Sequence, residues 1–193
     1  MYDGMHRFLP TLLRFEGLTV VEIMDAIHAG EIRGMYILGE NPAMSDPDVE
    51  HARDALAKLD HLVVQDIFLT ETANYADVIL PASAWAEKTG TVTNTNRQVQ
   101  MGRPAVPPPG EAREDWRILI DLANASGADW SFDSPAEVYD ELARDADKFS
   151  GISHARLDAT AELPKTGLQW PCPSPEHPGT TFLHEEGILR GKG

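Results

Sequence analysis

Three short apolar runs, each preceded by a helical pattern, constrain most strongly what this chain can fold into. The runs span residues 35–38, 62–64 and 77–80, and each ends at a glycine, a proline or a polar residue. Continuous apolar runs of this length are typical of strands buried in a parallel sheet. Because helical patterns alternate with these runs, the sequence predicts an α/β fold, a Rossmann-like parallel sheet flanked by helices.

The helical patterns have recognisable beginnings and ends. They are predicted at residues 18–30, 47–59, 70–74, 114–126 and 135–148. Thr19 and Thr70 stand where helix caps are expected, and Gly30 stands where the first helix would stop. We expect the last two helices, which follow a proline-rich linker at residues 104–110, to cover the sheet.

The chain becomes richer in glycine and proline toward the C-terminus, and this change suggests how it divides into domains. Many of the 15 glycines and 14 prolines fall between Pro164 and Gly193, which predicts an irregular tail. The polar segment 91–101 is predicted to be extended or looped. We therefore expect an N-terminal linker at residues 1–16, one Rossmann-like domain at residues 17–163, and an irregular tail at residues 164–193.

The net charge of -15, from 31 acidic and 16 basic residues, opposes broad contact with nucleic acid or an anionic membrane. No apolar stretch approaches the about 18 residues of a membrane span, and residues 1–16 lack the apolar core of a signal peptide. We expect a soluble, cytoplasmic protein. A phosphate-bearing ligand would have to be held locally, by backbone N–H groups and one or two cations.

Reactive side chains are few. The single cysteine, Cys172, cannot form an intrachain disulfide and cannot alone hold an iron–sulfur cluster or a structural zinc ion. The seven histidines are scattered, and no serine elbow or zinc protease signature occurs. We predict no metal ligand and no catalytic residue, so the chain is expected to bind rather than react.

Ligands of doubly wound sheets bind at the carboxyl ends of the strands, so the loops after the runs are candidate sites. After the first run, Gly39 would let a ligand approach the backbone closely, and Asn41 offers amide donors and an acceptor. The alternative is that this loop is merely a turn.

The next two loops also carry candidate residues. Gln65 and Asp66 close the second run, where a carboxylate can accept from ribose hydroxyls or from N1 and N2 of guanine; alternatively, Asp66 caps the next helix. Lys88 follows the third run and could neutralise a pyrophosphate, or it is a solvated charge beside Glu87. No glycine-rich dinucleotide or phosphate-loop motif occurs, which argues against an ordinary nicotinamide or ATP site.

Taken in order, four segments of the chain resemble one family. They are Tyr-Ile-Leu-Gly-Glu-Asn-Pro at 36–42, Val-Gln-Asp-Ile-Phe-Leu-Thr-Glu-Thr-Ala at 64–73, Ala-Asp-Val-Ile-Leu-Pro-Ala at 76–82 and Ala-Glu-Lys-Thr-Gly-Thr-Val-Thr-Asn at 86–94. From about Gly17 to its end, the chain resembles the second dinucleotide-binding domain of molybdopterin oxidoreductases. The segments at 167–173 and 177–180 make it most similar to the catalytic (alpha) subunits of cytoplasmic, NAD-linked formate dehydrogenases.

The resemblance implies a ligand and a set of contacts. The ligand would be one molybdopterin guanine dinucleotide (MGD) of the Mo-bis-MGD cofactor. By resemblance, the residues that contact it would be Gly39, Glu40 and Asn41 along the nucleotide, Gln65 and Asp66 at its ribose or guanine, Lys88 at the pyrophosphate or pterin, and Asp115. The assignment of Asp115 rests on resemblance alone.

The chain also departs from the family. Asn96-Arg97-Gln98 stands where the family commonly has Glu-Arg-Arg, which puts charge pairing in this strand in doubt. No region matches the domains that supply the metal-ligating Cys or selenocysteine, the active-site His and Arg, the cluster cysteines or the C-terminal barrel. The resemblance therefore implies a fragment, in which Cys172 is a structural or incidental thiol and not the molybdenum ligand.

The implied activity belongs to the whole enzyme. It is oxidation of formate to CO2 at molybdenum or tungsten, with electrons leaving through iron–sulfur clusters in the missing part. The partners would be the other domains of the same subunit and iron–sulfur or flavin electron-transfer subunits. The isolated chain would be inactive. The alternatives are the same domain of another molybdopterin oxidoreductase, such as nitrate reductase, or a noncatalytic cofactor-binding or interaction module.

Overall fold

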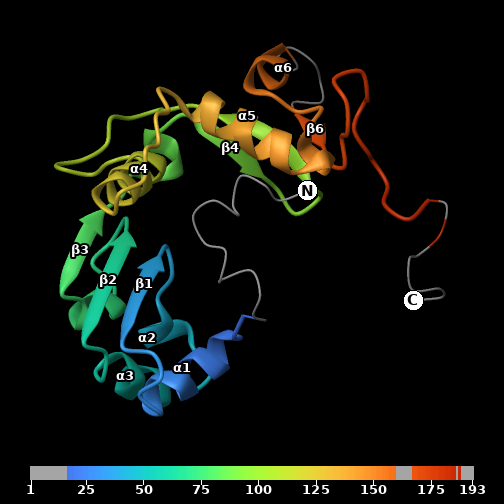
Figure 1. The fold of residues 1–193 in the computed structure, drawn as a ribbon. Helices are drawn as coiled ribbons and strands as arrows, with labels where there is room; N and C mark the ends of the chain where they lie inside the picture. Colours follow the sequence, from blue (N-terminus) through green and yellow to red (C-terminus); the bar gives the residue numbers. More distant parts are fainter. Residues whose placement is uncertain (1–16, 160–166, 186, 188–193) are drawn as a thin grey trace. The chain divides into compact units, whose positions relative to one another are not determined.

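The computed structural model describes residues 17–159, 167–185 and 187, and these form two compact units (Figure 1). The sheet unit contains the described residues 17–87 and 106–130. The hairpin unit contains residues 88–105 and the described residues from 131 onward. The stretch 17–163, predicted as one domain, thus contributes to both units. The predicted linker at 1–16 and the predicted boundary at 163 and 164 lie outside the described residues.

A three-stranded parallel sheet forms the centre of the sheet unit and confirms the predicted fold class. Its strands are β1 (Gly34–Leu38), β2 (His61–Asp66) and β3 (Val78–Pro81), in the order β1-β2-β3 (Figure 1). Leu38 pairs with Gln65, and Asp66 pairs with Pro81. The three carboxyl ends therefore lie at one edge of the sheet, where the sequence places the candidate loops.

Four of the five predicted helices are present with shorter bounds, and the one predicted at residues 70–74 is a 3-10 helix at residues 72–75. The helix at residues 135–145 was expected to cover the parallel sheet but packs in the hairpin unit instead. The sheet unit contains α1 (Val20–His28), α2 (Pro42–Ser45), α3 (Val49–Leu56), η3 (Thr72–Tyr75), η4 (Trp85–Glu87) and α4 (Asp115–Ala125). Thr19 caps α1 as expected: its backbone N–H donates to Glu22 Oε2 at 2.7 Å, and its side chain accepts from Glu22 N. Gly30 follows α1 at a φ of 76°, a left-handed conformation that costs glycine little.

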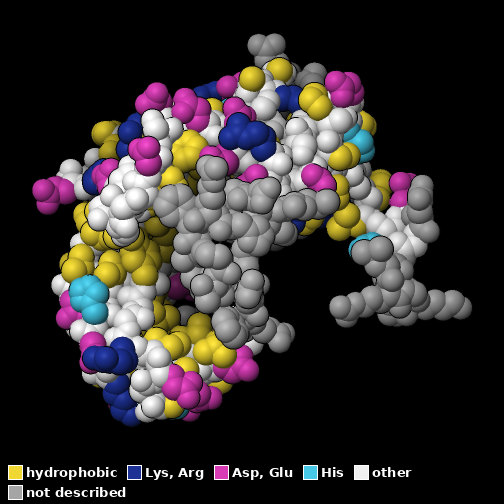
Figure 2. Space-filling view, in the orientation of Figure 1, with side chains coloured by type: hydrophobic (Ala, Val, Ile, Leu, Met, Phe, Trp, Pro, Cys, Tyr) yellow, Lys and Arg dark blue, Asp and Glu magenta, His cyan; other side chains and the backbone are white. Residues whose placement is uncertain are grey.

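Alternation along the strands gives the sheet two different faces. One face presents Ile37, Leu62 and Val64 to α2, α3 and η3, and α1 packs on α3 through a second apolar cluster. The other face carries Tyr36 and the fully buried Gln65. Hydrophobic side chains of the edge strands stay partly exposed, and Figure 2 shows hydrophobic side chains gathered over the sheet.

The hairpin unit is built on an antiparallel sheet. Its elements are β4 (Gly90–Thr93), β5 (Gln98–Gly102), α5 (Pro135–Asp145), η5 (Asp147–Phe149), α6 (His154–Ala159) and β6 (Leu168–Gln169). β5 pairs with both β4 and β6, so the segment predicted to be extended or looped is largely a β-hairpin. Arg97, at the turn, has a φ of 68°.

The described part of the tail is largely irregular, as its composition predicted, apart from the two-residue strand β6, but it is packed against the rest of the hairpin unit. Leu168 belongs to β6, and Leu168 and Cys172 are both buried in the core of the hairpin unit. The Arg156 guanidinium donates to the carbonyl oxygens of Ser174 and His177 and to Cys172 Sγ. Pairing with β5 and these contacts hold the segment in place. A high Gly and Pro content indicates only that the segment lacks helical or strand periodicity, and it does not predict how the segment packs.

Candidate functional site

The loop after β1 begins with an accessible glycine. Gly39 has a φ of 65°, and its N–H donates to Gln65 O at 2.9 Å, which ties the loop to β2. A Cβ built on Gly39 would meet no atom within 4 Å, so the backbone borders open space. Glu40 follows as an exposed side chain. This arrangement leaves the backbone of the loop exposed, and its contact with a ligand stays a prediction.

Asn41 joins two loops, a role that its sequence position did not reveal. Its Oδ1 accepts from Thr72 N at 3.1 Å and from Thr72 Oγ1 at 2.8 Å. Its Nδ2 donates to Glu71 Oε2 at 2.7 Å, and this hydrogen bond is the main cause that lowers the pKa of Glu71. Thr72 Oγ1 in turn accepts from Ala43 N at 3.1 Å. The side-chain oxygen of Asn41, Oδ1, is thus already bonded within the protein, and the side chain holds the loop after β1 against η3.

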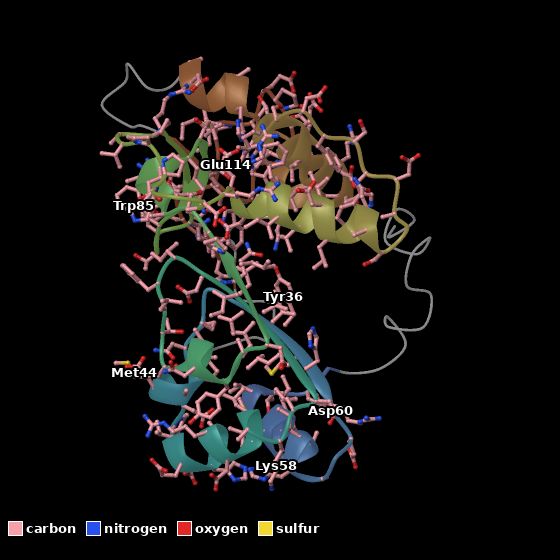
Figure 3. All side chains as sticks on the ribbon, turned by 90° about the vertical axis from the view of Figure 1, so that its left-hand side faces the viewer. Tyr36, Met44, Lys58, Asp60, Trp85 and Glu114 are labelled. Atoms are coloured by element: carbon pink, nitrogen blue, oxygen red, sulfur yellow. The ribbon has the colours of Figure 1, made fainter. Side chains whose placement is uncertain are left out.

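The fully buried Gln65 lies at the centre of a hydrogen-bonded row whose two outer members are half-buried. Its Nε2 donates to Asp115 Oδ1 at 2.8 Å, and its Oε1 accepts from the Tyr36 hydroxyl. Burial, and secondarily the charge of Asp115, raise the pKa of Tyr36, so its hydroxyl keeps its proton at neutral pH. Tyr36 lies on the sheet below Glu114, the residue that precedes α4 (Figure 3).

Asp66 shapes the loop after β2 and does not cap the following helix. Its Oδ1 accepts from Phe68 N at 3.1 Å, a short-range turn contact. η3 begins without a side-chain cap, although the Thr70 hydroxyl accepts from Ala73 N at 3.3 Å. The Asp66 carboxylate is half-buried at the carboxyl end of β2, where it was expected to meet a ligand.

Backbone hydrogen bonds to the end of β3 hold Asp115 near the carboxyl ends of the strands. Arg113 N donates to Pro81 O at 3.0 Å, and Ser83 N donates to Arg113 O at 2.8 Å. These bonds place the first residue of α4 beside the carboxyl end of the sheet. Its position in the first helical turn favours a negative charge. Asp115, which only resemblance suggested, therefore lies beside Gln65, at the end of the sheet where Asp66 closes β2.

Lys88 belongs to the hairpin unit, so its approach to the ligand stays a prediction. It directly follows η4 and is half-buried, which does not fit a fully solvated charge. The neighbouring Glu87 carboxylate accepts from Ala84 N at 2.8 Å.

Sequence reasoning missed Tyr36, Glu71 and Thr72. Alternation around Ile37 could have placed Tyr36 on the same face as Gln65, whereas only the polar run 70–72 hinted at Thr72. Within the part of the chain that the structure describes, no group of His, Cys, Asp or Glu is arranged to hold a metal ion. None of the described helices is long and apolar enough to span a membrane.

The site is rich in acceptors. Asp66 and Asp115 present carboxylates, which accept N–H and O–H donors and repel phosphate. Ribose hydroxyls and the N1 and N2 groups of guanine are donors of this kind. A pyrophosphate would need the exposed backbone around Gly39 or a cation from elsewhere. The geometry therefore fits the nucleoside end of a nucleotide.

Comparisons with known proteins identify similar chains. The sequence model of the molybdopterin oxidoreductase family matches residues 11–125. The alpha subunit of F420-dependent formate dehydrogenase from Methanocaldococcus jannaschii is 46% identical over 92% of this chain and 26% of its own length. Formate dehydrogenase 2 subunit alpha from Methanococcus maripaludis is 48% identical, over 92% of this chain and 25% of its own.

Two further comparisons broaden this result. The assimilatory nitrate reductase catalytic subunit of Bacillus subtilis is 40% identical over 90% of this chain and 24% of its own length. The solved structure of acetylene hydratase from Pelobacter acetylenicus aligns with 72% of this chain and 20% of its own, with a TM-score of 0.60 and 20% identity. That likeness shows the fold. The chain spans about a quarter of the length of the curated relatives.

Proposed function

The chain belongs to the molybdopterin oxidoreductase family, and from that premise we propose that its sheet unit binds the guanine dinucleotide form of molybdopterin. Membership implies a molybdopterin cofactor. The observation that carries the finer proposal is the hydrogen bond between Gln65 and Asp115 at the carboxyl end of β2, the strand that Asp66 closes. Guanine offers adjacent N–H donors, which suit a carboxylate acceptor.

Each predicted contact residue has a role in this proposal. Asp66 and Asp115 accept from ribose hydroxyls or the guanine edge, and Gln65 holds Asp115 in place. Gly39 lets the ligand approach the backbone, and Glu40 lines the same loop. Asn41 acts by fixing the loop, and Lys88 would approach the pyrophosphate or pterin. When bound, the cofactor supplies redox chemistry at molybdenum or tungsten.

We extend the proposal to the whole subunit, on the names of its relatives. The whole enzyme would convert formate to CO2 with release of two electrons and a proton; a Mo-bis-MGD cofactor would supply that redox chemistry, and this chain would hold one half of it. The electrons leave through iron–sulfur clusters held outside this chain, toward iron–sulfur or flavin subunits, in the cytoplasm. In this proposal the sheet unit and Lys88 hold the cofactor, and residues 164–193 lead to a further domain of the same subunit.

A second candidate substrate is nitrate, favoured by the 40% identity with a nitrate reductase catalytic subunit. The intact subunit assayed with a redox dye separates the two substrates. Dye reduction by formate supports the first substrate, and dye oxidation by nitrate supports the second. The 193-residue chain alone should turn over neither substrate, and metal-dependent turnover by it would contradict the proposed division of labour.

Nucleotide binding by the subunit prepared without cofactor tests the site itself. We expect GDP to bind, and Asp66→Ala to abolish or strongly weaken that binding. Asp60→Ala is the matched control, because Asp60 is an exposed carboxylate that pairs with Arg33 before the start of β2 (Figure 3). A noncatalytic interaction module would bind no GDP and would be indifferent to both substitutions.

A further inference from the structure

The hydrogen bonds around Gln65 have a defined direction. An ionised carboxylate only accepts, so the Gln65 amide must turn its Nε2 toward Asp115, and its Oε1 then faces Tyr36. An amide oxygen only accepts, so the Tyr36 hydroxyl must donate. The direction of every bond in the row Tyr36–Gln65–Asp115 therefore follows from the negative charge at its end.

We propose that Tyr36 is a positioning residue whose hydroxyl fixes the Gln65 amide and, through it, holds the Asp115 carboxylate ready to accept donors from a bound nucleoside. This inference rests on the proposed function, and it adds a residue that no sequence pattern assigned. Tyr36 acts through Gln65 and contacts no ligand itself.

Burial makes this arrangement sensitive to one hydroxyl. Gln65 is fully buried, so loss of the Tyr36 donor would leave Oε1 as a buried acceptor without its partner. Rotating the amide cannot repair the loss, because Oε1 would then face the Asp115 carboxylate and repel it. The amide would lose its fixed orientation, and Asp115 would lose its directed donor.

The Tyr36 hydroxyl can donate this hydrogen bond at every physiological pH. Burial and the nearby Asp115 charge both raise the pKa of Tyr36 above its usual 10, so the phenol keeps the proton that it donates. Phenylalanine fills nearly the same volume as tyrosine, so Tyr36→Phe removes the donor and little else. Tyr75 on η3 is a half-buried tyrosine against the sheet core and outside this row, so Tyr75→Phe is the matched control.

The test measures GDP affinity by calorimetry, on the intact subunit that carries this chain, prepared without cofactor. We expect Tyr36→Phe to weaken GDP binding about five- to tenfold, the effect of about one lost hydrogen bond. Tyr75→Phe should leave the affinity unchanged. In an Asp115→Asn background, Tyr36→Phe should cause no further loss, because its effect passes through that carboxylate.

A purely structural tyrosine would behave differently. It would weaken binding to the same extent with or without the Asp115 carboxylate, and that additive result would overturn the proposal. Gln65→Met provides a second variant: it should weaken GDP binding at least as much, and Tyr36→Phe should add nothing to it.

Two failures can be told apart. If the wild-type subunit binds no GDP, the proposed function and this inference fall together. If the wild type binds GDP and Tyr36→Phe binds it equally well, the proposed function stands and the role of Tyr36 is wrong.

Discussion

Gln65 and Asp115 are 50 residues apart in sequence, yet Gln65 Nε2 donates to Asp115 Oδ1 across 2.8 Å. The bond joins the carboxyl end of β2 to the first turn of α4. Gln65 is fully buried and Asp115 is half-buried, so the bond is partly shielded from water and contributes more than a surface contact would. Its consequence is that an acidic group that we propose contacts a ligand is also part of the fold.

Gln65→Leu should destabilise the protein by about 2 kcal/mol, because the Tyr36 hydroxyl and Asp115 both lose a partner beside an apolar side chain. Urea unfolding measures the change. Gln100→Leu is a control, since Gln100 lies half-buried on β5 of the hairpin unit. Equal losses in the two variants would contradict a special role for the buried row.

Thr72→Val should cost about 1 to 3 kcal/mol, because valine keeps the shape but loses the hydroxyl that donates to Asn41 Oδ1 and accepts from Ala43 N. Thr72→Ser retains that hydroxyl and should recover most of the loss. Chemical denaturation compares the three proteins. A serine variant as unstable as the valine variant would show that the methyl group, and not the hydroxyl, matters.

Gly39→Ala and Gly30→Ala form a matched pair. Both glycines have positive φ, and an added Cβ would meet nothing within 4 Å at either, so each substitution should cost about 1 kcal/mol of stability. Only Gly39 borders the proposed ligand, so only Gly39→Ala should weaken GDP binding. Calorimetry with GDP checks this, and equal affinity in both variants would remove the loop after β1 from the site.

Tyr139 should make the hairpin unit sensitive to alkali. Burial, and secondarily Cys172, raise the pKa of Tyr139 to about 12, whereas the unfolded phenol titrates near 10. Between these values the unfolded state has released the proton that the folded state keeps. The free energy of unfolding therefore falls as pH rises from 10 to about 12.

Tyr139→Phe should remove that alkaline loss. Among the described residues the Tyr139 hydroxyl is buried without a hydrogen-bond partner, so the variant should also be at least as stable at pH 7. Urea titrations at pH 7, 9, 10 and 11 would follow both effects. An unchanged slope above pH 10 in the variant would assign the alkaline sensitivity to another group.

The hairpin unit illustrates what composition could not predict. Residues 164–193 are rich in Gly and Pro, yet Leu168 and Cys172 are buried in the core. Gly167 allows the close approach of this segment, since a Cβ there would lie 2.3 Å from Val99 O. A pairing between residues some seventy positions apart leaves no local pattern in the sequence.

The sequence by itself determined the parallel sheet, the α1 cap at Thr19 and the loops in which a ligand would be sought. These features depend on side-chain periodicity and on turn chemistry between neighbouring residues, which one segment carries alone. Only the tertiary structure decided that Asn41 clamps Thr72 and that Tyr36, Gln65 and Asp115 form one row. Such hydrogen bonds join side chains from separate strands and helices, so their distances and directions exist only once the chain has folded.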